Sequence, residues 1–313
     1  MHTRPISTRV PRALRLPRHA LVALLIALLA PLCLVASSQA STAASSTVPT
    51  RIVSLSPTAT QILFAIGAGK QVVAADADSS LPANAPRTSL SGYDPNVEAI
   101  AHYQPQLVVI SYNPSGLAAS LEKLGIKVLD QDAASTLRDT YGQIAELGTM
   151  TGHAKGAQKL ITKMRSEIAG IVAEAPKFSP RLTYYYELDQ TYYTATSATF
   201  VGSLMAMLGL KNIADAAPDA ASGYPQLSAE FIVKADPKVI VLADTVSGGQ
   251  SATTVAARPG WSSIAAVKTG GVIPINDSVA SQWGPNVVTL ERDVEQGLAK
   301  LAAKDHASLS AAR

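Results

Sequence analysis

Cysteine and histidine are almost missing from this 313-residue sequence, and their scarcity excludes several kinds of chemistry. The one cysteine, Cys33, lies in an apolar segment near the N-terminus, so the rest of the chain can form no disulfide, thiolate nucleophile or cysteine metal site. Beyond residue 40 the histidines are His102, His153 and His306, and none has a partner at the spacing of a zinc motif. We therefore expect no resident metal or cofactor and no catalytic residues of these types.

Motifs for nucleotide binding and for hydrolysis are also lacking. No G-x-S-x-G elbow occurs. The run from Gly67 to Lys70 ends an expected helix instead of opening one, and it lacks the third glycine and the following Ser or Thr of a phosphate loop. These absences argue against an enzyme, although an enzyme that uses only carboxylates is left open.

The first 40 residues predict an export signal. Five arginines and no acidic residue are followed by an apolar run from Ala20 to Val35 and by small polar residues that end at Ala40. The alternative is a membrane anchor, but Pro31 interrupts the run, which is shorter than the ~20 apolar residues of a spanning helix. Lipid attachment at Cys33 is disfavoured because Leu32, and not a small residue, precedes it. We expect a periplasmic or other extracytoplasmic protein.

Charged residues are also scarce, and the excess of basic over acidic residues comes from the export segment. Without the five arginines, 21 basic residues face 23 acidic ones, a net charge of about −2. The basic pI is therefore a property of the signal, and we expect neither a nucleic-acid nor an anionic-membrane partner.

One unit of sequence occurs twice. Residues 97–111 and 229–243 align on Glu98 and Glu230, and each glutamate is followed by proline and then by an apolar β-rich run. Each copy predicts a short helix that ends before the proline and leads into a buried strand. Between the copies, residues 153–176 carry the apolar stripe of one long amphipathic helix.

This pattern predicts an α/β protein of two Rossmann-like lobes with mostly parallel sheets, joined by a single long helix, with a ligand cleft between the lobes. The expected strands are 51–55, 71–75, 106–111 and 126–130 in the first lobe, and 181–186, 239–243 and 271–276 in the second. The expected organisation is a signal peptide (1–40), a flexible stretch (41–50), the N-terminal lobe (51–152), the helix (153–176), the C-terminal lobe (177–304) and a tail (305–313).

Aromatic residues form only 5 % of the chain, but several stand where strands pass into loops. Rings contributed by both lobes could hold a flat or bulky ligand. The candidate ligand-binding residues are Tyr93, Tyr112, Tyr186, Tyr193, Tyr224 and Trp283.

Glu98 and Glu230 begin equivalent helices, where a glutamate favours the helix dipole. Two copies at one repeat position also suit a two-fold-symmetric partner that carries paired arginines. They are the candidate docking residues.

Residues 50–303 resemble the periplasmic binding proteins for iron siderophores and cobalamin, the type with a rigid helix between its lobes. The resemblance lies in Arg51-Ile-Val-Ser-Leu-Ser-Pro, in Gly92-Tyr-Asp-Pro-Asn-Val-Glu98 and in Tyr224-Pro-Gln-Leu-Ser-Ala-Glu230. It implies the capture subunit of an ATP-driven importer, acting as a monomer with a permease dimer and a cytoplasmic ATPase. It also implies that Glu98 and Glu230 engage the permease, and that Tyr224 contacts the ligand; Tyr93 matches a residue that contacts iron in some haem-binding relatives.

Where the family often has an arginine after Gly-Pro, this chain has Asn286, which argues against a strongly anionic catecholate. We expect a ferric siderophore first, cobalamin second and haem third, captured with a modest hinge motion. The alternatives are a carboxylate-based enzyme on the same scaffold, and an adhesion or sensory module that would not need both glutamates.

Overall fold

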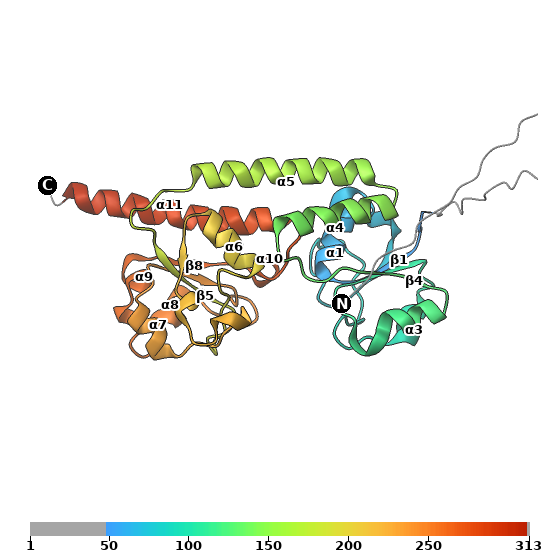
Figure 1. Cartoon of the computed structure of the whole chain (residues 1–313), viewed down its shortest axis with the longest axis horizontal. Coiled ribbons are helices and arrows are strands. Elements are labelled where there is room, and N and C mark those ends of the chain that lie inside the picture. The colour runs from blue at the N-terminus through green and yellow to red at the C-terminus, as the bar shows by residue number, and fades with distance from the viewer. Residues whose placement is uncertain (1–47, 312–313) are drawn as a thin grey trace, which may run out of the picture. The chain divides into compact units, whose positions relative to one another are not determined.

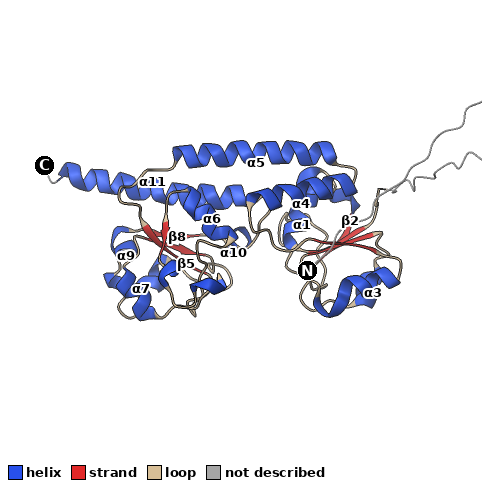
Figure 2. Cartoon of the chain, viewed as in Figure 1, coloured by secondary structure: helices blue, strands red, loops and turns tan. Residues whose placement is uncertain are grey.

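The computed structural model describes residues 48–311, which contain two parallel β-sheets of four strands each. The strand order is β2-β1-β3-β4 in the first sheet and β6-β5-β7-β8 in the second. Figure 2 shows the two sheets as separate groups of red strands, each with its own helices. The predicted α/β class with two parallel sheets is confirmed. The predicted export signal, residues 1–40, lies outside the described residues.

The first lobe, residues 52–150, alternates short strands with helices. Its strands are β1 (Ile52–Leu55), β2 (Val72–Ala75), β3 (Leu107–Ile110) and β4 (Lys127–Asp130), and its α-helices are α1 (Pro57–Ile66), α2 (Val97–His102), α3 (Leu117–Lys123) and α4 (Leu137–Met150). Every residue of β1 and β3 is buried. Both faces of these strands are therefore covered, which explains why their sequences are mostly apolar and do not alternate with polar residues.

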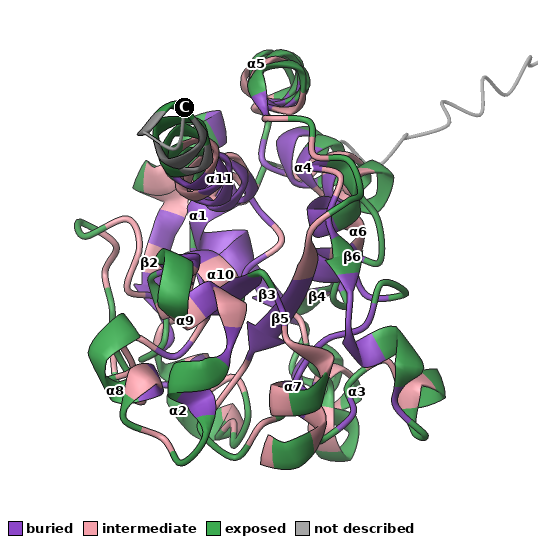
Figure 3. Ribbon diagram, turned by 90° about the vertical axis from the view of Figure 1, so that its left-hand side faces the viewer, coloured by how far each residue is buried: buried purple, intermediate pink, exposed green. Residues whose placement is uncertain are grey.

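The second lobe, residues 183–280, repeats this plan. Its strands are β5 (Thr183–Glu187), β6 (Lys211–Asn212), β7 (Val239–Leu242) and β8 (Val272–Pro274), and its α-helices are α6 (Phe200–Met207), α7 (Ala229–Ala235), α8 (Ala252–Ala256), α9 (Ala265–Thr269) and α10 (Asp277–Ala280). The interior strands β3 and β5 are purple, the colour of buried residues, in Figure 3. Strand β6, which has only two residues, was not predicted.

The two repeat units occupy equivalent places in the two sheets. Helix α2 leads into β3, which lies between β1 and β4, and α7 leads into β7, which lies between β5 and β8. Each helix begins with a side-chain cap: Asn96 accepts a hydrogen bond from the backbone N–H of Ala99, and Ser228 accepts one from Phe231. The internal repeat seen in the sequence is therefore a structural repeat.

Helix α5 (Ala154–Glu174) belongs to both hydrophobic cores. Ala157, Ile161 and Met164 pack with α1 and β1 in the first core, while Ile168 and Ile171 pack with β5 and β7 in the second. In Figure 1, α5 lies along α4 and along α11 (Val287–Ala311), and it contacts both. The predicted linking helix is confirmed.

A second connection between the lobes was not predicted. After α10 the segment 281–286 returns to the first lobe, where Gly284 lies against Thr58 of α1. Helix α11 then starts at Val287, and its second residue, Val288, packs against both cores. This helix continues to Ala311, so most of the segment expected to be a tail is helical.

Candidate ligand-binding site

Four of the six candidate aromatic residues expose much of their surface. The exposed fractions are 76 % for Tyr93, 52 % for Tyr112, 43 % for Tyr193 and 53 % for Tyr224. Rings with this much exposed surface are free to contact a ligand or a partner. These four residues, here called the exposed tyrosines, are divided equally between the two lobes.

In the first lobe, Tyr93 and Tyr112 lie side by side, with ring centroids 6.3 Å apart and an interplanar angle of 44°. Tyr112 follows β3 by two residues. The turn that carries Tyr93 is held by the Ser91 hydroxyl, which accepts hydrogen bonds from the backbone N–H groups of Tyr93 and Asp94. Gly92 allows the turn to approach β1, because a Cβ there would lie 2.6 Å from the carbonyl oxygen of Leu55. Both rings thus stand at the carboxyl edge of the first sheet.

In the second lobe, Tyr193 and Tyr224 lie in two loop segments that pair with each other. Tyr193 forms an antiparallel bridge with Gln226, and the N–H of Thr194 donates to the carbonyl of Pro225 at 3.0 Å. The N–H of Leu188, the residue after β5, donates to the carbonyl of Tyr193 at 3.0 Å. This pairing fixes both tyrosines at the carboxyl edge of the second sheet.

Trp283 lies in the segment that joins the lobes. Its indole N–H donates to the side-chain oxygen of Gln143 on α4 at 2.8 Å, and its carbonyl accepts from the Thr140 hydroxyl at 2.9 Å. A cavity of about 230 Å³ lies beside it. The cavity is lined by Ala133, Ala134, Leu188, Phe200, Val201, Tyr224, Ala280, Ser281, Gln282, Trp283 and Leu290. None of these side chains is charged, so the cavity suits a ligand surface of low charge.

The candidate Tyr186 is not part of this surface. It is completely buried in the second core, and its hydroxyl donates to the carbonyl of Ala280 at 3.4 Å. Burial raises the pKa of this hydroxyl above its ordinary value. Because β5 is covered on both faces, a residue one position before its end points into the core, and we remove Tyr186 from the ligand-binding set.

The candidate docking residues, Glu98 and Glu230, are exposed at the second positions of α2 and α7. The backbone N–H of Glu230 itself and the Ser228 hydroxyl lower the pKa of the Glu230 carboxyl. This side chain is therefore a carboxylate at neutral pH, as an arginine partner would require.

Sequence reasoning missed a buried ion pair at the carboxyl edge of the second sheet. Glu187, the last residue of β5, has no exposed surface, and Arg258 donates to both of its carboxylate oxygens at 2.6 Å. Burial, and then the nearby charge of Glu187, raises the pKa of the neighbouring Asp244 to about 7. Arg258 is the one charged residue in the apolar run Val255–Trp261, and such an arginine can indicate a buried ion pair. No sequence pattern identifies its partner, which lies 71 residues earlier in the chain.

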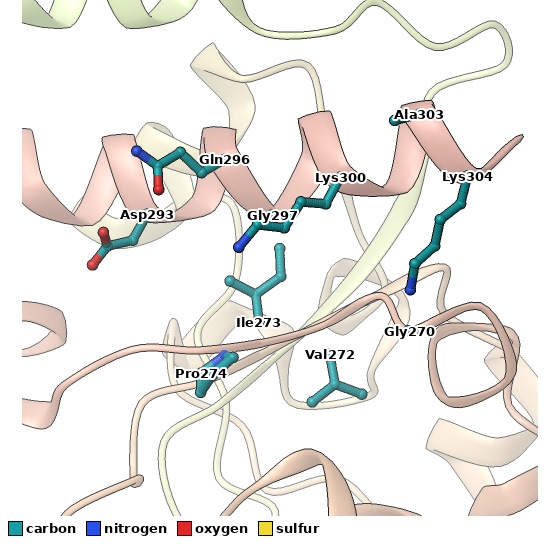
Figure 4. A pocket seen from close by; sticks show the side chains of 10 residues that line it. All are labelled: Gly270, Val272, Ile273, Pro274, Asp293, Gln296, Gly297, Lys300, Ala303 and Lys304. Carbon is teal, nitrogen blue, oxygen red and sulfur yellow. The ribbon is translucent and has the colours of Figure 1, made fainter. Parts of the chain in front are cut away.

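A different cavity, of about 560 Å³, lies between α11 and the edge strand β8 (Figure 4). Lys300 and Lys304 extend from α11 toward β8 there, and Lys304 donates to the carbonyl of Thr269 at 3.2 Å. The cavity contains none of the predicted ligand-binding residues.

In residues 48–311, no three His, Cys, Asp or Glu side chains gather as a metal site. No helix in the same range has the length and apolar character needed to cross a membrane.

The comparisons with known proteins agree with this architecture. A family model described as "Periplasmic binding protein" matches residues 52–279. The "Cobalamin-binding protein" of Halobacterium salinarum is 34 % identical over 77 % of this chain and 67 % of its own length. The "Uncharacterized ABC transporter substrate-binding lipoprotein YvrC" of Bacillus subtilis is 30 % identical over 77 % of both chains.

Among solved structures, the periplasmic haem-binding protein HutB of Vibrio cholerae has the same fold, with a TM-score of 0.70 at 21 % identity. The match covers 79 % of this chain and 98 % of HutB. The lobes, the linking helix and the family match together show that this chain belongs to the periplasmic binding protein family.

Proposed function

We propose that this chain captures a cobalamin-type metal chelate between its two lobes and delivers it to a membrane permease powered by an ATPase. The observation that carries the proposal is the placement of the exposed tyrosines, two at the carboxyl edge of each sheet. In open α/β sheets this edge is where ligands bind. Rigid rings can hold a bulky ligand at a small cost in conformational entropy.

The uncharged lining beside Trp283 bears on which chelate is bound. It supplies no cation for a catecholate or for the carboxylates of haem, whereas a chelate whose periphery is made of amides needs only hydrogen bonds and apolar contact. The name of the Halobacterium relative also supports cobalamin. We therefore place cobalamin ahead of the ferric siderophore that the sequence analysis put first, with haem third.

Fluorescence quenching of the exported form of the chain tests the proposal. Trp283 is half-buried beside the cavity, whereas Trp261 is completely buried and serves as the internal comparison. We expect saturable quenching by cyanocobalamin, with weaker or no effect from a ferric hydroxamate or haemin. We also expect Tyr224→Ala to weaken binding at least about tenfold. Free tryptophan with the same coloured ligands gives the correction for absorbance.

Absence of saturable quenching by all three probes would defeat the proposal, while tight binding of the hydroxamate alone would return the siderophore to first place. Recovery of the bound ligand without chemical change separates a binding protein from a carboxylate-based enzyme.

Delivery is tested through Glu98 and Glu230. We expect Glu98→Ala with Glu230→Ala to abolish uptake by whole cells and to leave the affinity of the isolated protein unchanged, because the two side chains are exposed outside the cavity. Glu122→Ala, an exposed glutamate on α3, is the matched control. Normal uptake by the double variant would instead favour an adhesion or sensory module.

A further inference from the structure

Hydrogen bonds and burial fix the geometry of the Glu187–Arg258 ion pair. Both guanidinium nitrogens of Arg258 reach the carboxylate at 2.6 Å, and one of them also donates to the side-chain oxygen of Gln250 at 2.7 Å. The Glu187 side chain has no exposed surface and that of Arg258 only 12 %. Removing two charges from water is costly, and bidentate geometry with an extra hydrogen bond is what offsets that cost.

Two aromatic rings complete the surroundings of Arg258. Its guanidinium carbon lies 4.5 Å from the ring centroid of Trp261 and 5.7 Å from that of Tyr192. Tyr192 and Trp261 stack on each other, with centroids 5.6 Å apart and planes inclined by 27°. The cation therefore holds Tyr192 against a completely buried tryptophan.

The position of Tyr192 determines that of the next residue. Tyr192 has a left-handed φ of +71°, which costs free energy in a residue with a bulky side chain and persists only where its surroundings impose it. Its ring is directed inward, and Tyr193 consequently projects outward with 43 % of its surface exposed. The carbonyl of Tyr192 also accepts the N–H of Leu227 at 3.1 Å, which joins it to the segment that carries Tyr224.

From this chain of contacts we infer that Arg258, through Tyr192, is the residue that positions Tyr193 and Tyr224 for ligand capture. The inference rests on the proposed function, because it assigns these two tyrosines to the ligand. Arg258 itself lies behind the loop and is absent from the lining of the cavity. Its role is to give the two segments 188–196 and 223–227 one fixed conformation before the ligand arrives, which lowers the entropic cost of binding.

Hydrogen exchange followed by mass spectrometry tests the inference without any ligand. The amides of Leu188, Thr194, Thr196 and Leu227 are hydrogen-bonded within the paired segments. We expect Arg258→Lys, which removes the bidentate and stacking geometry, to speed their exchange about tenfold and to leave exchange in the first sheet unchanged. Cyanocobalamin should bind this variant about tenfold more weakly.

A second set of variants keeps the ion pair intact. Tyr192→Asn retains a residue that tolerates the left-handed conformation but removes the ring, and it should reproduce both effects. Tyr192→Phe restores the ring and should restore both. Arg292→Lys is the control, because Arg292 forms an exposed ion pair with Glu174 at 2.7 Å on the helices α11 and α5.

Unchanged exchange in both Arg258→Lys and Tyr192→Asn would overturn the inference, as would faster exchange throughout the protein, which indicates general loss of stability. If the wild-type protein binds none of the chelates, the proposed function fails, and the exchange data still decide whether Arg258 orders the loop.

Discussion

Glu291 places a carboxyl group inside the protein on α11. The side chain has no exposed surface, and neither of its oxygens has a hydrogen-bond partner among the described residues. Burial alone raises the pKa of this carboxyl from 4.5 to about 8. In the folded protein Glu291 therefore keeps its proton over a pH range in which the unfolded chain has lost it.

This shift gives a pH dependence of known sign. The contribution of Glu291 to folding is greatest below pH 4.5, and it falls by about 1.4 kcal/mol per pH unit until the pH reaches about 8. Buried Asp244, whose pKa is raised to about 7, adds a slope of the same sign, so we expect Glu291→Gln to lower the slope of the unfolding free energy against pH by about 1.4 kcal/mol per pH unit. We also expect this variant to be more stable than the wild type at pH 8. Urea unfolding at pH 5, 6, 7 and 8 measures it, with the exposed Glu122→Gln as control. A slope in Glu291→Gln that equals the wild-type slope between pH 7 and 8 would contradict this assignment.

The sequence revealed the surface tyrosines better than the buried polar groups. The exposed tyrosines follow strands or lie in turns, and both signals are local. Tyr186 is in a similar position along the chain, and only the covering of β5 on both faces decides that it points inward. The Glu187–Arg258 pair depends on a contact between distant segments, which a single sequence does not encode in any local pattern.

At the scale of elements, α5 approaches α1 so closely that one of its residues must lack a side chain. A Cβ at position 156 would lie 2.0 Å from the carbonyl oxygen of Ile66, whereas one at Gly170 on the same helix would meet nothing within 4 Å. Gly156 is therefore required for packing, and Gly170 only lowers the helix propensity of α5.

The two glycines make a matched pair of variants. We expect Gly156→Ala to lower the free energy of unfolding by about 2 kcal/mol or more, because the backbones must separate. Gly170→Ala should raise it by up to about 1 kcal/mol. Chemical denaturation of both variants measures the two changes, and equal effects would show that the α1–α5 contact is looser than described.

Most strands and the linking helix were predictable because their signals are strong, whereas the long helix α11 was not predicted. The apolar runs predicted seven of the eight described strands, and the amphipathic stripe predicted α5. The two-residue β6 has no periodicity to detect. The return of segment 281–286 to the first lobe was missed because it depends on tertiary packing of a loop.

At the scale of the whole molecule, the two cores are coupled by shared elements. Helix α5 contributes to both, Val288 packs against both, and Gln61 of the first lobe is hydrogen-bonded to Gln282 of the joining segment. Loss of packing in one core therefore removes partners from the other. The lobes should unfold together in one transition.

A variant in the first core and a probe in the second test this coupling. Ile62 is completely buried in the first core, and Ile62→Ala should cost about 2–5 kcal/mol. In a Trp283→Phe background, Trp261 reports only on the second lobe. In Ile62→Ala we expect the urea midpoint measured by Trp261 fluorescence to fall together with the midpoint measured by circular dichroism. A Trp261 transition that stays at the unmutated midpoint would mean that the lobes unfold independently.

The division of α5 between two cores also sets where related proteins can be recombined. Residues up to Met164 have their neighbours in the first lobe, and residues from Ile168 onward have theirs in the second. A chimera of two related proteins would be joined between these two positions, with a second junction before α11. Each half of α5 then stays with the core against which it packs. Hybrids built on that plan would exchange one wall of the proposed ligand cleft and preserve the packing of both cores.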